Sequence, residues 1–112
     1  MISCLNVLDR CSHPIDLLTQ FRKKLAKDGY LVVAFAYPFA PYVEMGTSTV
    51  PAEHLKITGS TFEDQAQSFS EIMDSIGFEM ISFSKLPYLC EGDMSAPYYL
   101  LEDSVFVFKV KN

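Results

Sequence analysis

Four apolar segments along the chain have the length and pattern of β-strands, with polar or helical stretches between them. They are Ile2 to Leu8, Tyr30 to Ala36, Phe78 to Leu86 and Val105 to Val110. The second segment is continuously apolar, which is typical of a central parallel strand covered on both faces. The third alternates only in part between apolar and polar residues. The pattern therefore predicts a small sheet whose second strand is its most buried member.

Two segments between these strands have the apolar period of an amphipathic helix. The first is predicted from Pro14 to about Lys27, with Gly29 as its C-cap. The second begins at Ser60 or Thr61, which are followed three residues later by Glu63 and Asp64 in the pattern of a capping box, and Gly77 closes it. Its apolar face, predicted to pack in the core, is Phe62, Ala66, Phe69, Met73 and Ile76.

The order of these elements predicts an α/β fold with three parallel strands and an antiparallel last strand. The last two strands have no room for a crossover helix, so they should be antiparallel neighbours. The carboxyl ends of the three parallel strands, at residues 6–9, 37–44 and 86–93, should then meet at one edge of the sheet. Ligands of open α/β sheets bind at that edge. After the exit of the second strand at residues 37–44, the chain continues to about Gly59 without a clear period of apolar residues. Connections of this length are often functional.

Composition narrows the class of protein further. A chain of 112 residues is long enough for one small domain, and its net charge of −5 argues against nucleic acid as a partner. No apolar run is long enough to span a membrane, and no signal peptide is visible. The three cysteines form no Cys-x-x-Cys pair, so neither a zinc site nor a disulfide framework is indicated. We expect a reduced, intracellular and cytoplasmic protein with Cys4 in its core.

Four segments resemble the DREV family of methyltransferases, and the element order resembles the second half of the class I methyltransferase fold. The segments are residues 3–11, 38–44, 86–93 and 98–107. The class also has a glycine-rich loop and first strands for which this chain has no counterpart, and none of its five glycines forms Gly-x-Gly. The resemblance therefore implies that residues 1–112 are a single partial methyltransferase domain, which we expect to be an incomplete fragment.

The same resemblance implies a function and a set of site residues. It implies an S-adenosylmethionine-dependent protein-histidine methyltransferase that modifies the pros nitrogen in His-x-His segments and leaves S-adenosylhomocysteine. Asn6 and Tyr88 would approach the cofactor. Asp9 would be the catalytic residue and would hold the target imidazole together with Tyr99, with Tyr42 also on the substrate side. No metal is expected, because neither His13 nor His54 has a ligand partner at metal spacing.

Other interpretations of these residues stay open. Asn6 could be a turn residue at a strand end, Asp9 a helix cap, and the tyrosines packing residues. The chain could be a non-catalytic interaction module that dimerises through the exposed strand Ile2 to Leu8, since an unpaired apolar edge promotes association. A small-molecule methyltransferase is a third possibility.

Overall fold

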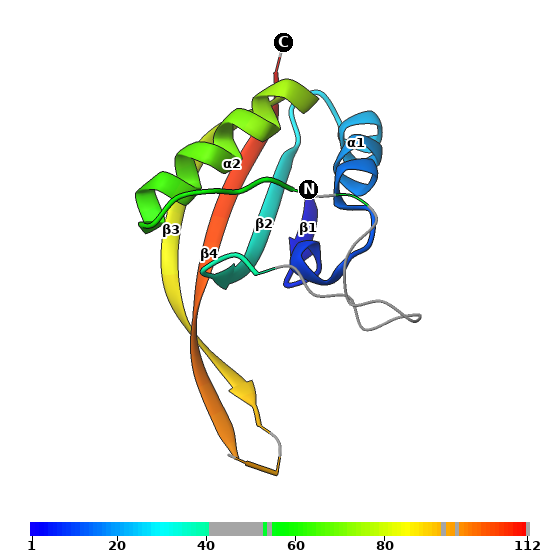
Figure 1. Ribbon diagram of the computed structural model, residues 1–112. Helices are drawn as coiled ribbons and strands as arrows, with labels where there is room; N and C mark the ends of the chain where they lie inside the picture. The colour runs from blue at the N-terminus through cyan, green and yellow to red at the C-terminus, as the bar shows by residue number, and fades with distance from the viewer. Residues whose placement is uncertain (41–52, 54, 93, 96, 112) are drawn as a thin grey trace.

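A four-stranded mixed sheet carries two helices on one face in the computed structural model, which describes residues 1–40, 53, 55–92, 94, 95 and 97–111 (Figure 1). The sheet order is β1-β2-β4-β3. The elements are β1 (Ile2–Leu5), the 3-10 helix η1 (Leu8–Arg10), α1 (Pro14–Lys24), β2 (Tyr30–Tyr37), α2 (Phe62–Ile76), β3 (Phe78–Glu91) and β4 (Tyr98–Val110).

The strands run in the directions that the sequence predicts, but the three parallel strands are not all adjacent to one another. β1 is parallel to β2, and β4 is antiparallel to both β2 and β3, so β1, β2 and β3 run in one direction. β4 lies between β2 and β3, so β3 has no parallel neighbour. This order buries Phe106 and Phe108 of β4 in the middle of the sheet, where both flanking strands satisfy its backbone.

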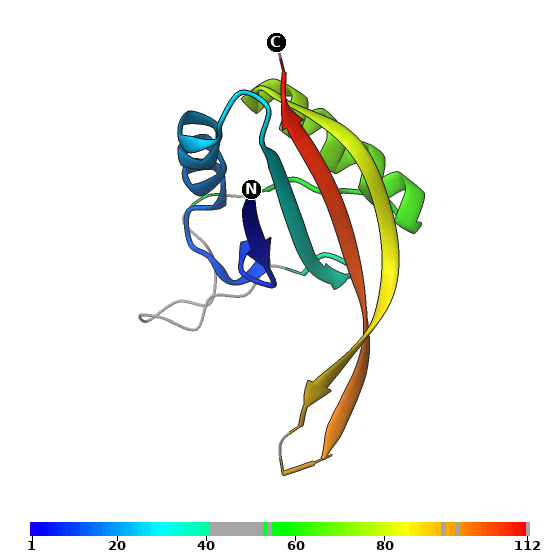
Figure 2. The same ribbon diagram turned by 180° about the vertical axis from the view of Figure 1, so that it is seen from behind.

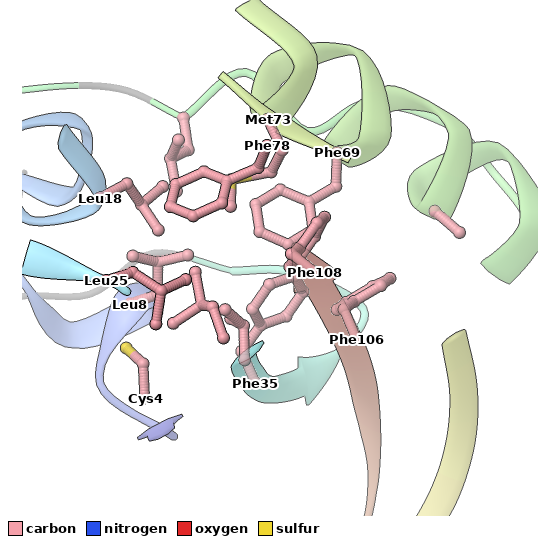
Figure 3. Close-up of a cluster of buried hydrophobic side chains, with 14 residues drawn as sticks. Cys4, Leu8, Leu18, Leu25, Phe35, Phe69, Met73, Phe78, Phe106 and Phe108 are labelled. Atoms are coloured by element: carbon pink, nitrogen blue, oxygen red, sulfur yellow. The ribbon is translucent and has the colours of Figure 1, made fainter. Parts of the chain in front are cut away.

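Both helices pack on the same face of the sheet, and the core lies between them and the strands (Figures 1 and 2). The ring centroid of Phe69 on α2 lies 4.9 Å from that of Phe106 and 5.3 Å from that of Phe35 (Figure 3). The predicted core face of α2 is thus confirmed, and Cys4 is buried in the same cluster. No helix of the described residues is long and apolar enough to cross a membrane.

The opposite face of the sheet is more open than the apolar sequence of β2 predicts. Residues Leu31, Val33 and Phe35 point into the core and are fully buried. On the opposite face of the strand, Val32 and Ala36 are only partly buried, whereas Ala34 between them is buried. The prediction that β2 is covered on both faces is therefore confirmed only in part: within the described residues both helices lie on one side, and the second face is buried at Ala34 but not at Val32 or Ala36.

Two elements end earlier than the sequence predicts. β1 ends at Leu5 rather than at Leu8, because Asn6 adopts a left-handed conformation with φ 57° and turns the chain into η1. α1 ends at Lys24 rather than at Lys27. Leu25 becomes its C-cap in place of the expected Gly29, with an extended backbone and a side chain that is buried in the core.

The ends of α2 follow the predicted capping pattern. Thr61 is the N-cap, and its side-chain hydroxyl accepts a hydrogen bond from the backbone N–H of Asp64 at 3.1 Å. Gly77 is the C-cap with φ 113°, a conformation that favours glycine. The guanidinium of Arg22 donates to the Gly77 carbonyl at 3.1 Å, so this turn also joins α2 to α1.

β3 and β4 are longer than the predicted strands and form a hairpin arm beyond the rest of the sheet (Figure 1). Tyr37, the last residue of β2, pairs with Glu102, which in turn pairs with Pro87. Beyond Glu102 and Pro87, the described residues of β3 and β4 pair only with each other. Pro87 is compatible with the strand because β3 is an edge of the sheet, where a missing N–H can face outward.

Candidate functional site

The carboxyl ends of β1 and β2 lie at one edge of the sheet, as the sequence pattern predicts, whereas β3 continues past this edge to Glu91 in the hairpin arm. β1 and β2 pair in parallel up to Leu5 and Ala34. The end of β2 is level with Pro87 of β3 through the intervening β4. This edge therefore gathers the segment from Asn6 to Asp9 and the exit of β2, with the base of the hairpin arm beside them (Figure 1).

Asn6 makes the turn that ends β1. Its backbone N–H donates to the carbonyl of Ala34 at 2.7 Å, and its left-handed φ is one that asparagine tolerates better than most residues. The side chain is half-buried at the carboxyl end of the strand. The turn interpretation of Asn6 is thus confirmed, and contact with a cofactor stays a prediction.

Asp9 lies in η1 and is almost completely buried, with 5% of its surface exposed. The preceding residue, Leu8, is packed in the core and fixes this short helix against the sheet. The Asp9 Oδ1 atom has no hydrogen-bond partner within the described residues. The alternative that Asp9 caps the following helix is wrong, because the N-cap of α1 is His13.

The surroundings of Asp9 disfavour its charged form. Burial raises the pKa of this carboxyl above its ordinary value, and the negative charge of Asp103 adds to the effect. The charge of Arg10 lowers the pKa, as do hydrogen bonds from the backbone amides of Asp9 itself and of Ala36. Asp9 therefore holds a proton more firmly than a surface carboxyl does, and its unpaired oxygen can accept a hydrogen bond from a substrate.

Asp103 is a second buried acid at this edge, and our interpretation of the sequence did not include it. It lies on β4 opposite Ala36, and 7% of its surface is exposed. Its Oδ1 atom also has no hydrogen-bond partner in the described part of the chain. The sequence does contain a signal, since a charged residue precedes the apolar run Val105 to Val110 on the strand that enters the middle of the sheet.

Two of the three tyrosines predicted for the site, Tyr88 and Tyr99, lie on the strands of the β3–β4 hairpin. Tyr88 is on β3, one residue past the level at which β2 ends. Tyr99 was expected in a connection but lies in β4, four residues from Asp103 and thus about 13 Å along the strand. The side chains of both lie outside what the structure describes, and Tyr42 lies outside the described residues altogether.

A cavity of about 590 Å³ opens elsewhere, between α2 and β3. Its lining includes Glu63 and Gln67 from α2 and Ser82 and Phe83 from β3, and none of the residues predicted for the site. The described residues also contain no group of three or more His, Cys, Asp or Glu side chains arranged to hold a metal ion. Asp9 and Asp103 at the sheet edge are thus the strongest chemical feature of the described structure.

The family model described as DREV methyltransferase matches residues 1–110, which is nearly the whole chain. The match includes every element of the sheet and the segment that carries Asn6 and Asp9.

Proposed function

Because the chain belongs to the DREV methyltransferase family, we propose that it forms the substrate side of a protein-histidine methyltransferase site. The reaction moves a methyl group from S-adenosylmethionine to the pros nitrogen of a histidine in a His-x-His segment. The observation that carries this proposal is the buried Asp9 carboxyl at the carboxyl edge of the sheet, whose Oδ1 atom has no hydrogen-bond partner within the described residues. Asp9 is the catalytic residue of the proposal, with Tyr99 and Tyr42 as further substrate contacts.

The chemistry of imidazole explains why a carboxylate suits this role. A neutral imidazole carries one N–H and one nitrogen with a free lone pair, and only the second can attack a methyl group. The pros nitrogen reacts when the proton is on the other ring nitrogen. The Asp9 carboxylate would accept that N–H, which fixes the tautomer and aims the pros nitrogen. Positioning of this kind is the main contribution that a methyl transfer needs from the protein.

The residues at this edge fit a methyl donor that carries a positive charge. Asp9 and Asp103 place two acidic side chains at this edge, each with an Oδ1 atom that has no hydrogen-bond partner among the described residues, and Asn6 offers an amide that can donate and accept hydrogen bonds. Asn6 and Tyr88 would hold S-adenosylmethionine, which supplies an electrophilic methyl group when bound. The contact of Asn6 with the methyl donor is argued from the position of Asn6 at this edge. The contact of Tyr88 with the donor rests on the family resemblance.

Mass spectrometry of a His-x-His peptide tests the proposal. The peptide is incubated with S-adenosylmethionine and either this chain or a form extended upstream, and the methylated ring nitrogen is identified by comparison with the two methylhistidine standards. We expect pros-methylation by the extended form. Asp9→Asn should reduce the rate by about 100-fold or more, because the ring N–H loses its charged acceptor and the amide can present a donor to the ring instead. Asp28→Asn, a change at an exposed turn, is the matched control.

The other outcomes distinguish the alternatives. Methylation that does not depend on Asp9 would contradict the role given to this residue. Methyl transfer to small nucleophiles but not to the peptide would favour a small-molecule methyltransferase. If neither form methylates the peptide, the histidine assignment fails.

A further inference from the structure

The cavity of about 590 Å³ between α2 and β3 is a groove along the outer edge of the sheet. The first turns of α2 extend past β3 at this edge (Figures 1 and 2). β3 lines the groove with residues 80–83. α2 lines it with residues three or four positions apart, which form one stripe of the helix: Glu63, Ala66, Gln67 and Ser70.

The β3 wall of the groove exposes apolar surface. Ile81 and Phe83 are each 48% exposed. The register of β3 against β4 shifts between Met80 and Ser82, so Ile81 has no partner on β4. The ring of Phe83 lies 5.8 Å from that of Phe62, between centroids, and the rest of it is open to solvent. Two large apolar side chains at a strand edge are therefore available to contact another protein.

The backbone of β3 is also available at this edge. β3 pairs with β4 on one side and with no strand of the described residues on the other. Its pairing with β4 is regular from Ser82 to Leu86, and the next residue, Pro87, has no N–H to donate. An extended segment of another protein can pair with such an edge as an added strand.

The charges around the groove favour a basic partner. α2 carries four carboxyl groups and no lysine or arginine. Asp74 is paired with Lys111, whose Nζ lies 2.6 Å from its Oδ1, but Glu63 is in none of the described ion pairs. Glu71 accepts a hydrogen bond from the side chain of Gln67 at 3.2 Å, which holds a second carboxylate beside the groove.

The one basic residue of β3, Lys85, is engaged elsewhere. Its Nζ lies 3.5 Å from the Oε2 atom of Glu102 on β4. The same ammonium lies over the rings of Tyr37 and Phe62, at 5.3 and 5.5 Å from their centroids. These contacts draw Lys85 over the sheet toward β2 and β4, so its charge is not aimed at a partner strand on the outer edge.

We propose that this groove binds an extended, basic segment of a partner protein, which adds its backbone to the edge of β3 between Ser82 and Leu86. Basic side chains of the segment meet Glu63 under α2, and apolar side chains pack on Ile81 and Phe83. A second copy of this chain is disfavoured as the occupant by its net charge of −5. The groove shares no residue with the proposed methyl-transfer site, so either proposal can fail without the other.

Fluorescence anisotropy of this chain with a labelled peptide of alternating lysine and valine tests the groove. We expect saturable binding that weakens as the salt concentration rises. A peptide of alternating glutamate and valine should bind about tenfold more weakly or worse, because like charges then face each other. A Lys-Val peptide with N-methylated central residues should lose affinity to a similar extent, since it lacks the backbone N–H groups of an added strand.

Two matched pairs of substitutions locate the binding. Glu63→Gln should weaken it by about threefold or more, whereas Asp64→Asn, which removes the same charge from the next exposed residue outside the groove, should not. Ile81→Ser should also weaken binding, whereas Leu89→Ser, at an exposed apolar position of β3 beyond the groove, should not. All four positions are exposed, so we expect the variants to fold, which far-UV circular dichroism checks.

The absence of saturable binding to the wild-type chain would overturn the proposal, and so would equal binding of the N-methylated peptide. Equal effects of Glu63→Gln and Asp64→Asn would contradict the location even if the peptide binds. If Ile81→Lys weakens self-association of the chain, the groove belongs to a second copy, and the proposed partner is wrong.

Discussion

At the scale of single residues, Asp9 has features that lower the free energy of unfolding and that also suit a substrate-binding site. Its carboxyl is buried, one oxygen lacks a hydrogen-bond partner in the described structure, and its pKa is raised above the ordinary 3.8. The folded chain thus binds the Asp9 proton more tightly than the unfolded chain does. The free energy of unfolding must therefore fall as pH rises from 3.8 through the folded-state pKa, and the loss is complete above that pKa.

We predict that Asp9→Asn makes the chain more stable at neutral pH, by about 1–2 kcal/mol, because the amide removes the charge and can donate a hydrogen bond. The gain should shrink as pH falls and vanish below the ordinary carboxyl pKa, where Asp9 is protonated in both states. Urea unfolding followed by far-UV circular dichroism over a pH series measures this. Asp28→Asn should change stability by less than about 0.5 kcal/mol. A variant less stable than wild type at neutral pH would contradict the prediction.

At the scale of elements, α2 is the helix whose limits are determined most clearly by its own sequence. The N-cap hydroxyl of Thr61 satisfies a backbone N–H that would otherwise lack a partner, and Gly77 accepts the positive φ that ends the helix. α1 lacks a side-chain cap at His13, and its end is set by packing of Leu25 into the core. α2 therefore depends on local chemistry, and the end of α1 on its tertiary surroundings.

Removal of the Thr61 hydroxyl should show this dependence. We expect Thr61→Ala to lower the free energy of unfolding by about 1 kcal/mol, since the Asp64 N–H loses its acceptor. Ser60→Ala changes the neighbouring exposed residue outside the helix and is the matched control. Equal effects of the two substitutions in urea unfolding would show that the cap contributes no stability of its own.

At the scale of the whole molecule, the sheet has two edges and one face that no described helix covers. β1 pairs with β2 on one side only, and Leu5 at its end is 55% exposed. A strand edge that carries apolar residues can pair with another chain. The sequence predicts self-association through a first strand at residues 2–8. In the structure this strand is β1, which ends at Leu5, and self-association through it remains a prediction.

We predict that the chain associates with itself as its concentration rises, and that Leu5→Lys weakens this association by placing a charge at the β1 edge. Ile81→Lys adds the same charge to an exposed apolar position on the opposite edge strand, β3, and is the control. Sedimentation velocity over a concentration series measures both. A sedimentation coefficient independent of concentration would contradict the prediction, and equal effects of the two variants would place the contact elsewhere.

The sequence by itself determined the elements whose signals are local. Strand and helix identities follow from apolar periodicity, and the limits of α2 follow from Thr61 and Gly77. The ends of β1 and β2 lie at one edge because the two strands run in the same direction, so the position of Asn6 and Asp9 at that edge could also be predicted. These features depend on neighbours in the chain or on general rules of chain connection.

Only the tertiary structure decided the features that depend on residues distant in sequence. The insertion of β4 between β2 and β3 depends on where Phe106 and Phe108 can be buried, and the end of α1 depends on the packing of Leu25. The burial of Asp9 and of Asp103 near the end of β2 requires the turn at Asn6 and the register of β2 against β4. No local pattern records such a contact, because burial and charge interaction arise only when the distant segments are packed together.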